Sequence, residues 1–267
     1  AGSHGIGQDV PQCVGFATYF NSTRPPKAYM YAIPYEYYTK YKIRRYGFHG
    51  TSHRYVSKHC AHLMHQPLED LNMITCHIGN GSSIAAIRDG KVIDTTMGLT
   101  PLDGFMMGTR SGSLDPSIVT FIMEQEGLTP SEMSDVLNMK SGMYGICGYS
   151  DDRDVTKAEI EGDPKAILAH EMLTYQIAKY IGAYITAMGG LDCVVFTGGI
   201  GENDKMVRSE VCKNMEYLGL KIDEEKNNQR GADIIDISAD DSRVKVLVVC
   251  TNEELMIARD AYKFVAE

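Results

Sequence analysis

The stretch from residue 72 to residue 96 constrains the fold most, because it reads as three short strands joined by two turns. Residues 72–86 give a strand, a glycine-rich turn and a second strand. Asp89-Gly90 is typical of a two-residue hairpin turn, and residues 91–96 read as the third strand. Strands joined this closely run antiparallel, so we expect an antiparallel meander here.

The segments that follow combine helices with buried strands. Residues 163–188 carry the longest helical pattern, which Gly189-Gly190 ends. A strand at 192–197 leads through a glycine loop into a helix at about 203–218. The β-branched run at 244–250 is typical of a strand buried on both faces, and a last helix closes the chain. This order predicts a mixed α/β fold.

The remaining segments are less regular. We expect a helix at 52–66 and helices within 116–140, the second of them opening at Ser131, followed by a glycine-punctuated loop at 141–154. Residues 28–46 are rich in tyrosine, and Pro34 predicts a break inside them. Tyrosine clusters form half-buried packing surfaces, which here could be a subunit interface.

Chain length and net charge limit the number of domains and the class of partner. With 267 residues the chain can form one large domain or two small ones, and its formal charge of −9 argues against nucleic acid as a partner. A small anionic substrate is still compatible, because a local basic cleft can lie in an acidic protein.

The cysteines and the apolar runs bear on location. Seven cysteines without a C-x-x-C pattern suggest buried thiols in a reducing cytoplasm. No apolar run reaches the ~20 residues that cross a bilayer, so we expect no membrane partner. The start of the chain does not resemble a signal peptide, and residues 1–5 resemble a cloning remnant.

Two glycine loops follow predicted strands. Gly79, Asn80 and Gly81 lie between two strands, where backbone N–H groups could approach phosphate oxygens, although a plain hairpin turn explains them as well. Residues 197–203, TGGIGEN, open a helix whose N-terminus favours anions, and the alternative is a cap with close strand–helix packing. The presence of both loops favours a nucleotide site.

Three charged segments could contribute to such a site. Arg110 lies among small residues in MMGTRSGSLDP, as a phosphoryl or carboxylate clamp requires, although a surface arginine would look the same. Asp151 and Arg153 could read a base or ribose, or belong to a solvated charge run. Glu253 follows a buried strand, where it could hold a divalent ion or act as a capping acid.

His49 and His53 are four residues apart, which would place both on one helix face and allows a zinc hypothesis. No glutamate follows His49, and Gly50 is a poor helix residue. Surface or core histidines are the default explanation. His49, between phenylalanine and glycine, better fits a hydrogen-bond donor to a charged group.

Taken together, five motifs closely resemble the acetokinase (acetate kinase) family of the actin-like phosphotransferase superfamily. They are RRYGFHGTSH, HIGNGSS, MMGTRSGSLDP, FTGGIGEN and TNEEL, which occur in the family's order from about residue 24 onward. The resemblance implies an α/β fold of the actin-like (ribonuclease H-like) type. It also implies reversible phosphoryl transfer from ATP to acetate with Mg²⁺, which gives ADP and acetyl phosphate.

The resemblance also implies roles for individual residues. His49 and Arg110 correspond to the groups that stabilise the transferring phosphoryl, and Glu253 to the magnesium ligand. The resemblance places the nucleotide against His77, Ile78, Gly79, Asn80, Gly81, Asp151, Asp152, Arg153, Gly199, Ile200, Gly201, Glu202 and Asn203. Phosphoryl transfer depends on positioning and charge neutralisation, which such a set can supply.

Two departures from the family pattern suggest impaired activity. The family carries another actin-like domain before this region, which supplies part of the acetate pocket. In addition, Ala17 stands where the family has its catalytic Asp, and Asn21 where it has a His. We therefore expect an altered segment at 1–23 and a C-terminal nucleotide-binding and dimerisation domain at 24–267.

Two alternatives stay open. The chain could be a non-catalytic dimerising scaffold, whose interface would be the tyrosine-rich segment and the helix at 163–188. It could also belong to an enzyme that uses propionate or butyrate, because the acyl pocket lies largely outside this region in the family. The resemblance suggests a homodimer in either case.

Overall fold

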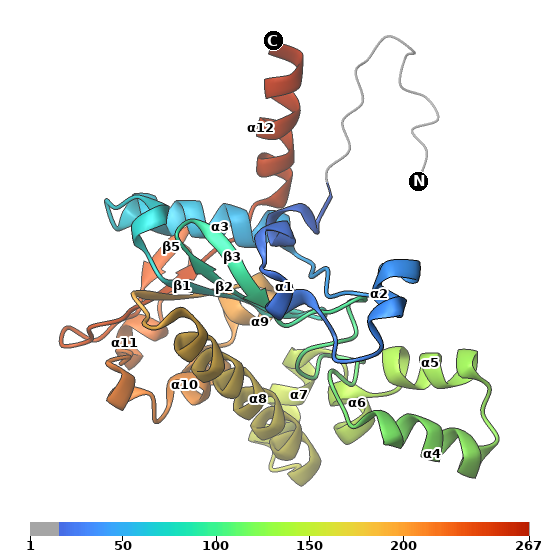
Figure 1. Ribbon diagram of the computed structural model, residues 1–267. Coiled ribbons are helices and arrows are strands. Elements are labelled where there is room, and N and C mark those ends of the chain that lie inside the picture. The colour runs from blue at the N-terminus through green and yellow to red at the C-terminus, as the bar shows by residue number, and fades with distance from the viewer. Residues whose placement is uncertain (1–15, 267) are drawn as a thin grey trace.

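A computed structural model describes residues 16–266, with side chains up to residue 263 (Figure 1). A six-stranded sheet forms its centre, in the order β3-β2-β1-β4-β6-β5. The strands are β1 (Met73–His77), β2 (Ser83–Arg88), β3 (Lys91–Thr95), β4 (Cys193–Thr197), β5 (Ile234–Asp236) and β6 (Lys245–Val249).

The expected meander is present, since β1, β2 and β3 pair antiparallel in sequence order. The three central strands β1, β4 and β6 run parallel, and β5 pairs antiparallel with β6 at the edge. In the β1–β4 ladder His77 pairs with Thr197, so both glycine loops begin at the same edge of the sheet. The carboxyl ends of parallel strands are where open α/β sheets bind ligands.

Helices cover both faces of the sheet. They are α1 (Pro26–Tyr29), α2 (Tyr35–Tyr41), α3 (Gly50–Leu63), α4 (Pro116–Glu126), α5 (Pro130–Met139), α6 (Gly142–Cys147), α7 (Asp152–Ile160), α8 (Pro164–Met188), α9 (Gly198–Asn203), α10 (Lys205–Cys212), α11 (Glu224–Asn227) and α12 (Glu253–Ala266). Three of them begin with proline after a side-chain cap, because the fixed φ of proline suits the first position of a helix. The caps are Asp115, Thr129 and Asp163.

Alternating strand residues point to opposite cores. Ile74 and Val194 face the larger core, to which α8 contributes apolar side chains such as Ile177. Thr75 and Val195 point to the other face, where α3 packs against β1, β4 and β6. All these strand side chains are fully buried, which explains why the strands read as continuous apolar runs.

Two parts extend away from this body (Figure 1). Helices α4 and α5 form an arm at one end of the molecule, and α4 buries none of its residues. Helix α12 projects from the opposite side and contacts α3 near its start. The break predicted at Pro34 is also present, since it separates α1 from α2.

Some sequence expectations were wrong. The segment 141–154 is not a loop throughout, because it contains α6 and the start of α7. The predicted helix at 203–218 begins earlier, at Gly198, and is divided at Asp204, which ends α9 and caps α10. The short β5 and α11 were not expected at all.

The described cysteines are free thiols, of which Cys60, Cys76, Cys193 and Cys212 are buried. Cys147 is partly exposed and Cys250 is exposed, so the expectation of buried thiols holds for four of these six; Cys13 lies outside the described residues. Within residues 16–266, no helix combines the length and apolar character needed to cross a bilayer.

Candidate functional site

A cavity of about 820 Å³ lies at the sheet edge where β1 and β4 end. This volume is in the range of small-ligand sites. Its walls include eight of the residues predicted to contact a nucleotide: Gly79, Asn80, Asp151, Asp152, Arg153, Gly199, Ile200 and Asn203. The two glycine loops and the charged segment at 150–154 therefore meet around one space, although they are far apart in the sequence.

The glycines after β4 serve different purposes. Gly198 has a φ of +79°, and a Cβ there would lie 2.8 Å from the carbonyl oxygen of Ile78, so only glycine fits. A Cβ on Gly199 would meet nothing within 4 Å, and this residue lines the cavity. A Cβ on Gly79 would lie 3.7 Å from the backbone nitrogen of Gly199. Gly198 thus makes the turn, and Gly199 leaves backbone accessible to a ligand.

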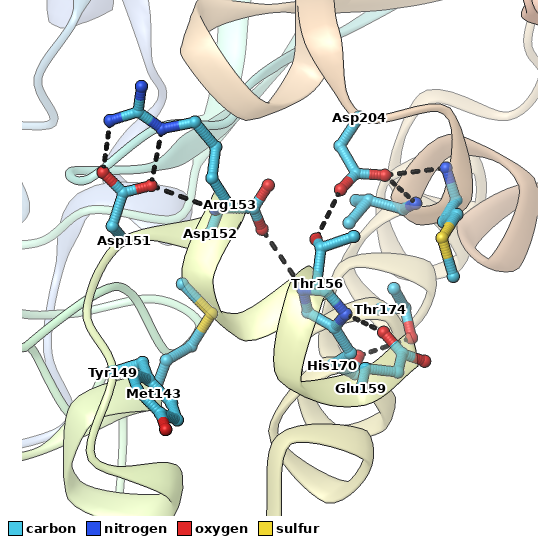
Figure 2. A network of polar contacts seen from close by, with 12 residues as sticks. Met143, Tyr149, Asp151, Asp152, Arg153, Thr156, Glu159, His170, Thr174 and Asp204 are labelled. Carbon is cyan, nitrogen blue, oxygen red and sulfur yellow. Dashed lines mark hydrogen bonds and ion pairs between the residues drawn. The ribbon is translucent and has the colours of Figure 1, made fainter. Parts of the chain in front are cut away.

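The start of α7 forms a charged wall (Figure 2). Asp151 caps the helix by accepting from the backbone N–H of Arg153, and it also accepts from the Arg153 guanidinium at 3.0 Å and 2.6 Å. These hydrogen bonds lower the pKa of Asp151 to about 2. Most of the Arg153 side chain is exposed, so the guanidinium N–H groups that do not contact Asp151 are accessible to a bound anion, while the Asp151 carboxylate offsets the charge.

Behind this wall, His170 of α8 lies between two carboxylates of α7 (Figure 2). Its Nδ1 contacts Glu159 and its Nε2 lies 3.2 Å from Asp152. Burial opposes a charged imidazole, but the hydrogen bonds that the ring donates to Asp152 and Glu159 outweigh it and raise the pKa of His170 to about 9. The protonated ring thus fixes the start of α7, and with it Asp151 and Arg153, on α8.

Asp204 lies on the other side of Asp152. It accepts from the backbone of Met206 and Val207 and from the hydroxyl of Thr156. Within the described part of the chain, Asp152, His170 and Asp204 are the one group whose donor atoms are close enough to share a metal ion. His170 already carries a proton between two carboxylates, so this group is satisfied without a metal.

The second centre lies at the other end of the HIGNG turn. A Cβ built on Gly81 would lie 3.0 Å from Arg110 Nη1 and 3.7 Å from His49 Nε2, so both side chains face Gly81. Among residues 16–266, the Arg110 side chain makes only two long contacts, to the oxygen of Pro101 at 3.4 Å and the sulfur of Met107 at 3.7 Å. Most of its five N–H donors are therefore free for an anion.

His49 belongs to a cluster of imidazoles. Its ring stacks on His77 at 4.2 Å between centroids, and His53 lies within 6.4 Å of both. Burial lowers the pKa of His49 to about 3, with further repulsion from His77 and Arg110, and burial lowers the pKa of His77 to about 4. His53 is fully buried, which also lowers its pKa. All three imidazoles are neutral at pH 7.

The backbone aims His49 at this place. His49 adopts a left-handed conformation with φ 54° directly before α3. The next amide, of Gly50, donates to the carbonyl oxygen of Ala17 at 2.8 Å, so position 17 lies beside the start of α3. Asn21 is fully buried and donates to the carbonyl oxygen of Phe48. Positions 17 and 21 therefore support the segment that carries His49.

Glu202 and Glu253 are the two glutamates among the predicted site residues. Glu202 accepts from Thr197, from the amide of Gly198 and from the amide of Thr251, so it joins the end of β4 to the start of α12. Glu253 is half-buried, and burial raises its pKa. In residues 16–266 its carboxylate has no hydrogen-bond or ion-pair partner, which fits a ligand of Mg²⁺, an ion that prefers few carboxylates and completes its shell with water and phosphate oxygen.

The remaining predicted residues do not line the cavity. Ile78 is fully buried in the core, Gly201 is buried in α9, and His77 lies in the imidazole cluster. Conversely, the cavity includes four residues that were not predicted: Ser150, Thr156, Asp204 and Arg230. Arg230 donates to the carbonyl oxygen of Asn203 at 3.1 Å, so it adds a second exposed cation to the rim.

Comparisons with known proteins agree with the motifs. The sequence model of the acetokinase family matches residues 5–259. The acetate kinase of Carboxydothermus hydrogenoformans is 57% identical over 257 residues, which are 96% of this chain and 64% of that protein. The acetate kinase of Thermotoga maritima is 59% identical over 260 residues, with the same coverage of both chains. The chain thus spans about 64% of the length of these relatives.

Solved structures give the same result. The crystal structure of Porphyromonas gingivalis acetate kinase has a TM-score of 0.91 and 48% identity, and covers 94% of this chain and 63% of that one. A propionate kinase from Francisella tularensis has a TM-score of 0.86 and 45% identity, and covers 92% and 62%. The predicted α/β fold is confirmed, and the chain shares it with these two kinase structures.

Proposed function

The chain belongs to the acetokinase family, and on this basis we propose that it is the nucleotide-binding part of an acetate kinase-type phosphotransferase. Its ligands would be ATP or ADP, with acetate or acetyl phosphate as the second substrate. The observation that carries the proposal is the convergence of Arg110 and His49 on Gly81, at the end of a turn whose preceding residues line the cavity.

This arrangement suits one orientation of the nucleotide. Arg153 and Arg230 supply cations at the far end, where the adenosine and its first phosphates would lie. Gly79 and Gly199 offer backbone without side-chain obstruction, as a phosphate chain requires. The terminal phosphoryl would then lie beside Gly81, between the guanidinium of Arg110 and the imidazole of His49.

The proposed chemistry needs no covalent intermediate on the protein. Arg110 would neutralise charge on the phosphoryl oxygens, and neutral His49 would donate a hydrogen bond to one of them. Glu253 would hold Mg²⁺, which would supply further neutralisation of phosphate charge. His49 is fixed before the substrate arrives, because its backbone conformation and the contact of its Nδ1 with Ser83 hold it.

Turnover by this chain is proposed to be low. Ala17, beside the start of α3, offers no carboxylate to orient acetate or accept a proton. The acid substrate also stays open, because relatives named for acetate and for propionate are similar to this chain to a comparable degree. A hydroxamate assay with acetate, propionate and butyrate tests both points, and acetyl phosphate formation at the rate of the longer relatives would contradict the first.

Nucleotide binding is tested directly by thermal shift. A ligand that binds only the folded state raises its stability by RT ln(1 + [L]/Kd), so ATP with Mg²⁺ at 100 times Kd should add about 2.7 kcal/mol. The matched control is the Arg153→Ala, Arg230→Ala double variant, whose shift should be much smaller. An unchanged melting temperature at millimolar nucleotide would favour a scaffold without ligand.

We also propose a homodimer. Exposed apolar side chains are present on α2 and α8, including Tyr35, Tyr41 and Tyr175, and on the arm at Phe121. Monomers rarely expose many large apolar groups close together, so these surfaces are candidates for the interface. Light scattering after size-exclusion chromatography tests this, with Tyr175→Glu and Phe121→Glu as variants that identify the contacting surface.

A further inference from the structure

A continuous chain of hydrogen bonds connects the core of the sheet to His49. The Oγ1 of Thr75 lies 2.8 Å from His53 Nδ1, and His53 Nε2 lies 2.8 Å from the Oγ of Ser83. The same Ser83 oxygen lies 2.9 Å from His49 Nδ1. Thr75, His53 and Ser83 are fully buried, so water cannot replace any of these contacts.

The number of protons allows only two arrangements of this chain. His49 and His53 are neutral, because burial lowers the pKa of both, and a neutral imidazole carries one N–H. Ser83 has one hydroxyl proton and two imidazole nitrogens beside it, so it donates to one and accepts from the other. The direction chosen at Ser83 therefore fixes both rings at once.

The Thr75 end of this hydrogen-bond chain selects its direction. If Thr75 donates to His53 Nδ1, then His53 donates from Nε2 to Ser83, and Ser83 donates to His49 Nδ1. In the reverse direction Thr75 would only accept, and its own proton would need another acceptor. Across residues 16–266, His53 is the single partner of the Thr75 hydroxyl, so reversal would leave a buried donor unpaired.

The other end of the hydrogen-bond chain, at His49, does not favour the reverse direction. A reversed chain would turn the lone pair of His49 Nε2 toward Gly81, where a neighbouring donor could stabilise it. Arg110 is the cation at that place, but its side chain donates to Pro101 and Met107 and makes no hydrogen bond to His49. The forward direction thus satisfies Thr75, His53 and Ser83, and it leaves an N–H on His49 facing Gly81.

We propose that Thr75, His53 and Ser83 are positioning residues that hold His49 in its Nε2–H tautomer, with that N–H directed toward Gly81. The use of this N–H, donation to a transferring phosphoryl group, rests on the proposed function. The tautomer itself is a property of the folded chain and can be measured without any ligand.

The test is nuclear magnetic resonance of the 267-residue chain labelled with ¹⁵N-histidine at pH 7, with no nucleotide present. Two-bond ¹H–¹⁵N correlations distinguish Nε2–H from Nδ1–H imidazoles, and His49→Gln and His53→Gln variants assign the two signals. We expect Nε2–H at both residues. An Nδ1–H pattern for the signal that His49→Gln removes would overturn the proposal.

Two serine variants then identify what sets the tautomer. Ser83→Ala should leave His49 as a mixture of both tautomers, because Nδ1 loses its donor. Ser52→Ala is the matched control, since Ser52 is equally buried but contacts Nδ1 of His77, 2.9 Å away, and it should leave His49 unchanged. A His49 pattern unaltered by Ser83→Ala, in a chain with a native amide spectrum, would contradict the role of Ser83.

The threonine is tested by Thr75→Val, which keeps the shape and removes the hydroxyl, and by Thr75→Ser, which restores it. Only Thr75→Val should disturb the His53 and His49 signals, and an undisturbed pattern would contradict its role. If the Nε2–H tautomer is found but ATP does not shift the melting temperature, the positioning holds and the proposed function fails. If ATP raises the melting temperature but His49 is the Nδ1–H tautomer, the proposed function holds and the positioning role fails.

Discussion

Arg110 and His49 approach the same point of the backbone although they come from distant segments. A Cβ on Gly81 would lie 3.0 Å from the Nη1 of Arg110 and 3.7 Å from the Nε2 of His49. Glycine thus leaves a space between a cation and an imidazole, at the end of a turn that also borders the cavity. This space is the proposed position of the terminal phosphoryl, so variants at Arg110 and variants at the cavity rim should have different effects on nucleotide binding.

Arg110→Ala should weaken ATP binding more than ADP binding. Only ATP has a phosphoryl group at the proposed position, and a hydrogen bond to a charged group contributes about 2 kcal/mol, or roughly 30-fold in affinity. Calorimetric titration with each nucleotide measures this difference. Arg153→Ala is the control, since it lies at the adenosine end and should weaken both nucleotides alike. An equal loss for ATP and ADP in Arg110→Ala would contradict the proposed orientation.

Adjacent glycines should respond in opposite ways to alanine. Gly198→Ala should destabilise the fold by about 2 kcal/mol, because its φ is +79° and the new methyl would lie 2.8 Å from the Ile78 oxygen. Gly199→Ala should change stability by less than about 0.5 kcal/mol, since its methyl meets nothing, but it should weaken nucleotide binding. Urea denaturation and nucleotide titration of both variants measure this, and equal destabilisation would contradict the division of roles.

The sequence predicted the glycine turns of the site, because a turn after a strand depends on residues close in sequence. The strands before Gly79 and Gly198 are short apolar runs, and a glycine after such a run indicates a turn regardless of the rest of the chain. The parallel pairing of β1 with β4 then brings the two turns together. The sequence alone gave no distance between them, because that pairing spans more than a hundred residues.

The parts that were missed depend on tertiary contacts. His170 is a single histidine in a long helix, and its partners Glu159 and Asp152 lie 11 and 18 residues earlier. Asp151 was attributed to a loop because glycines precede it, although an Asp followed by acids is also a helix start, and it caps α7. Asp204 was also missed, because the predicted helix at 203–218 ran through it, although Asp is a common N-cap residue.

A single acid should account for much of the magnesium dependence. Glu253 is half-buried and, within the described chain, has no hydrogen-bond or ion-pair partner, so a cation would stabilise its charge. In Glu253→Gln the ratio of ATP affinities with and without Mg²⁺ should fall about tenfold, as titration calorimetry can show. Glu254→Gln is the matched control, because that side chain is exposed one position further on and should keep the ratio. An equal fall in both variants would argue against Glu253 as the ligand.

On the acid side, buried neutral histidines should reduce stability. The pKa values of His49 and His77 are lowered to about 3 and about 4 from 6.5, so below pH 6.5 the unfolded chain binds protons that the folded chain does not. The free energy of unfolding should therefore fall from pH 6.5 toward pH 4, by roughly 1.4 kcal/mol per unit for each histidine. Denaturant titrations of the unmodified chain and His49→Gln check this, and the variant should show a shallower fall.

On the alkaline side, His170 should act with the opposite sign. Its pKa is raised from 6.5 to about 9, so its charge stabilises the fold fully below pH 6.5, and this contribution is lost as pH rises through 9. Since the ring is buried between Asp152 and Glu159, the loss should be about 2–3 kcal/mol between pH 6.5 and pH 9.5. His170→Gln should be less stable at pH 6.5 and should lack this decline, because it has no proton to lose. The nucleotide affinity of the unmodified chain should fall over the same range, since the deprotonated ring no longer holds the start of α7. A decline of equal size in His170→Gln would assign the titration to another group and would remove the link between α8 and the cavity wall.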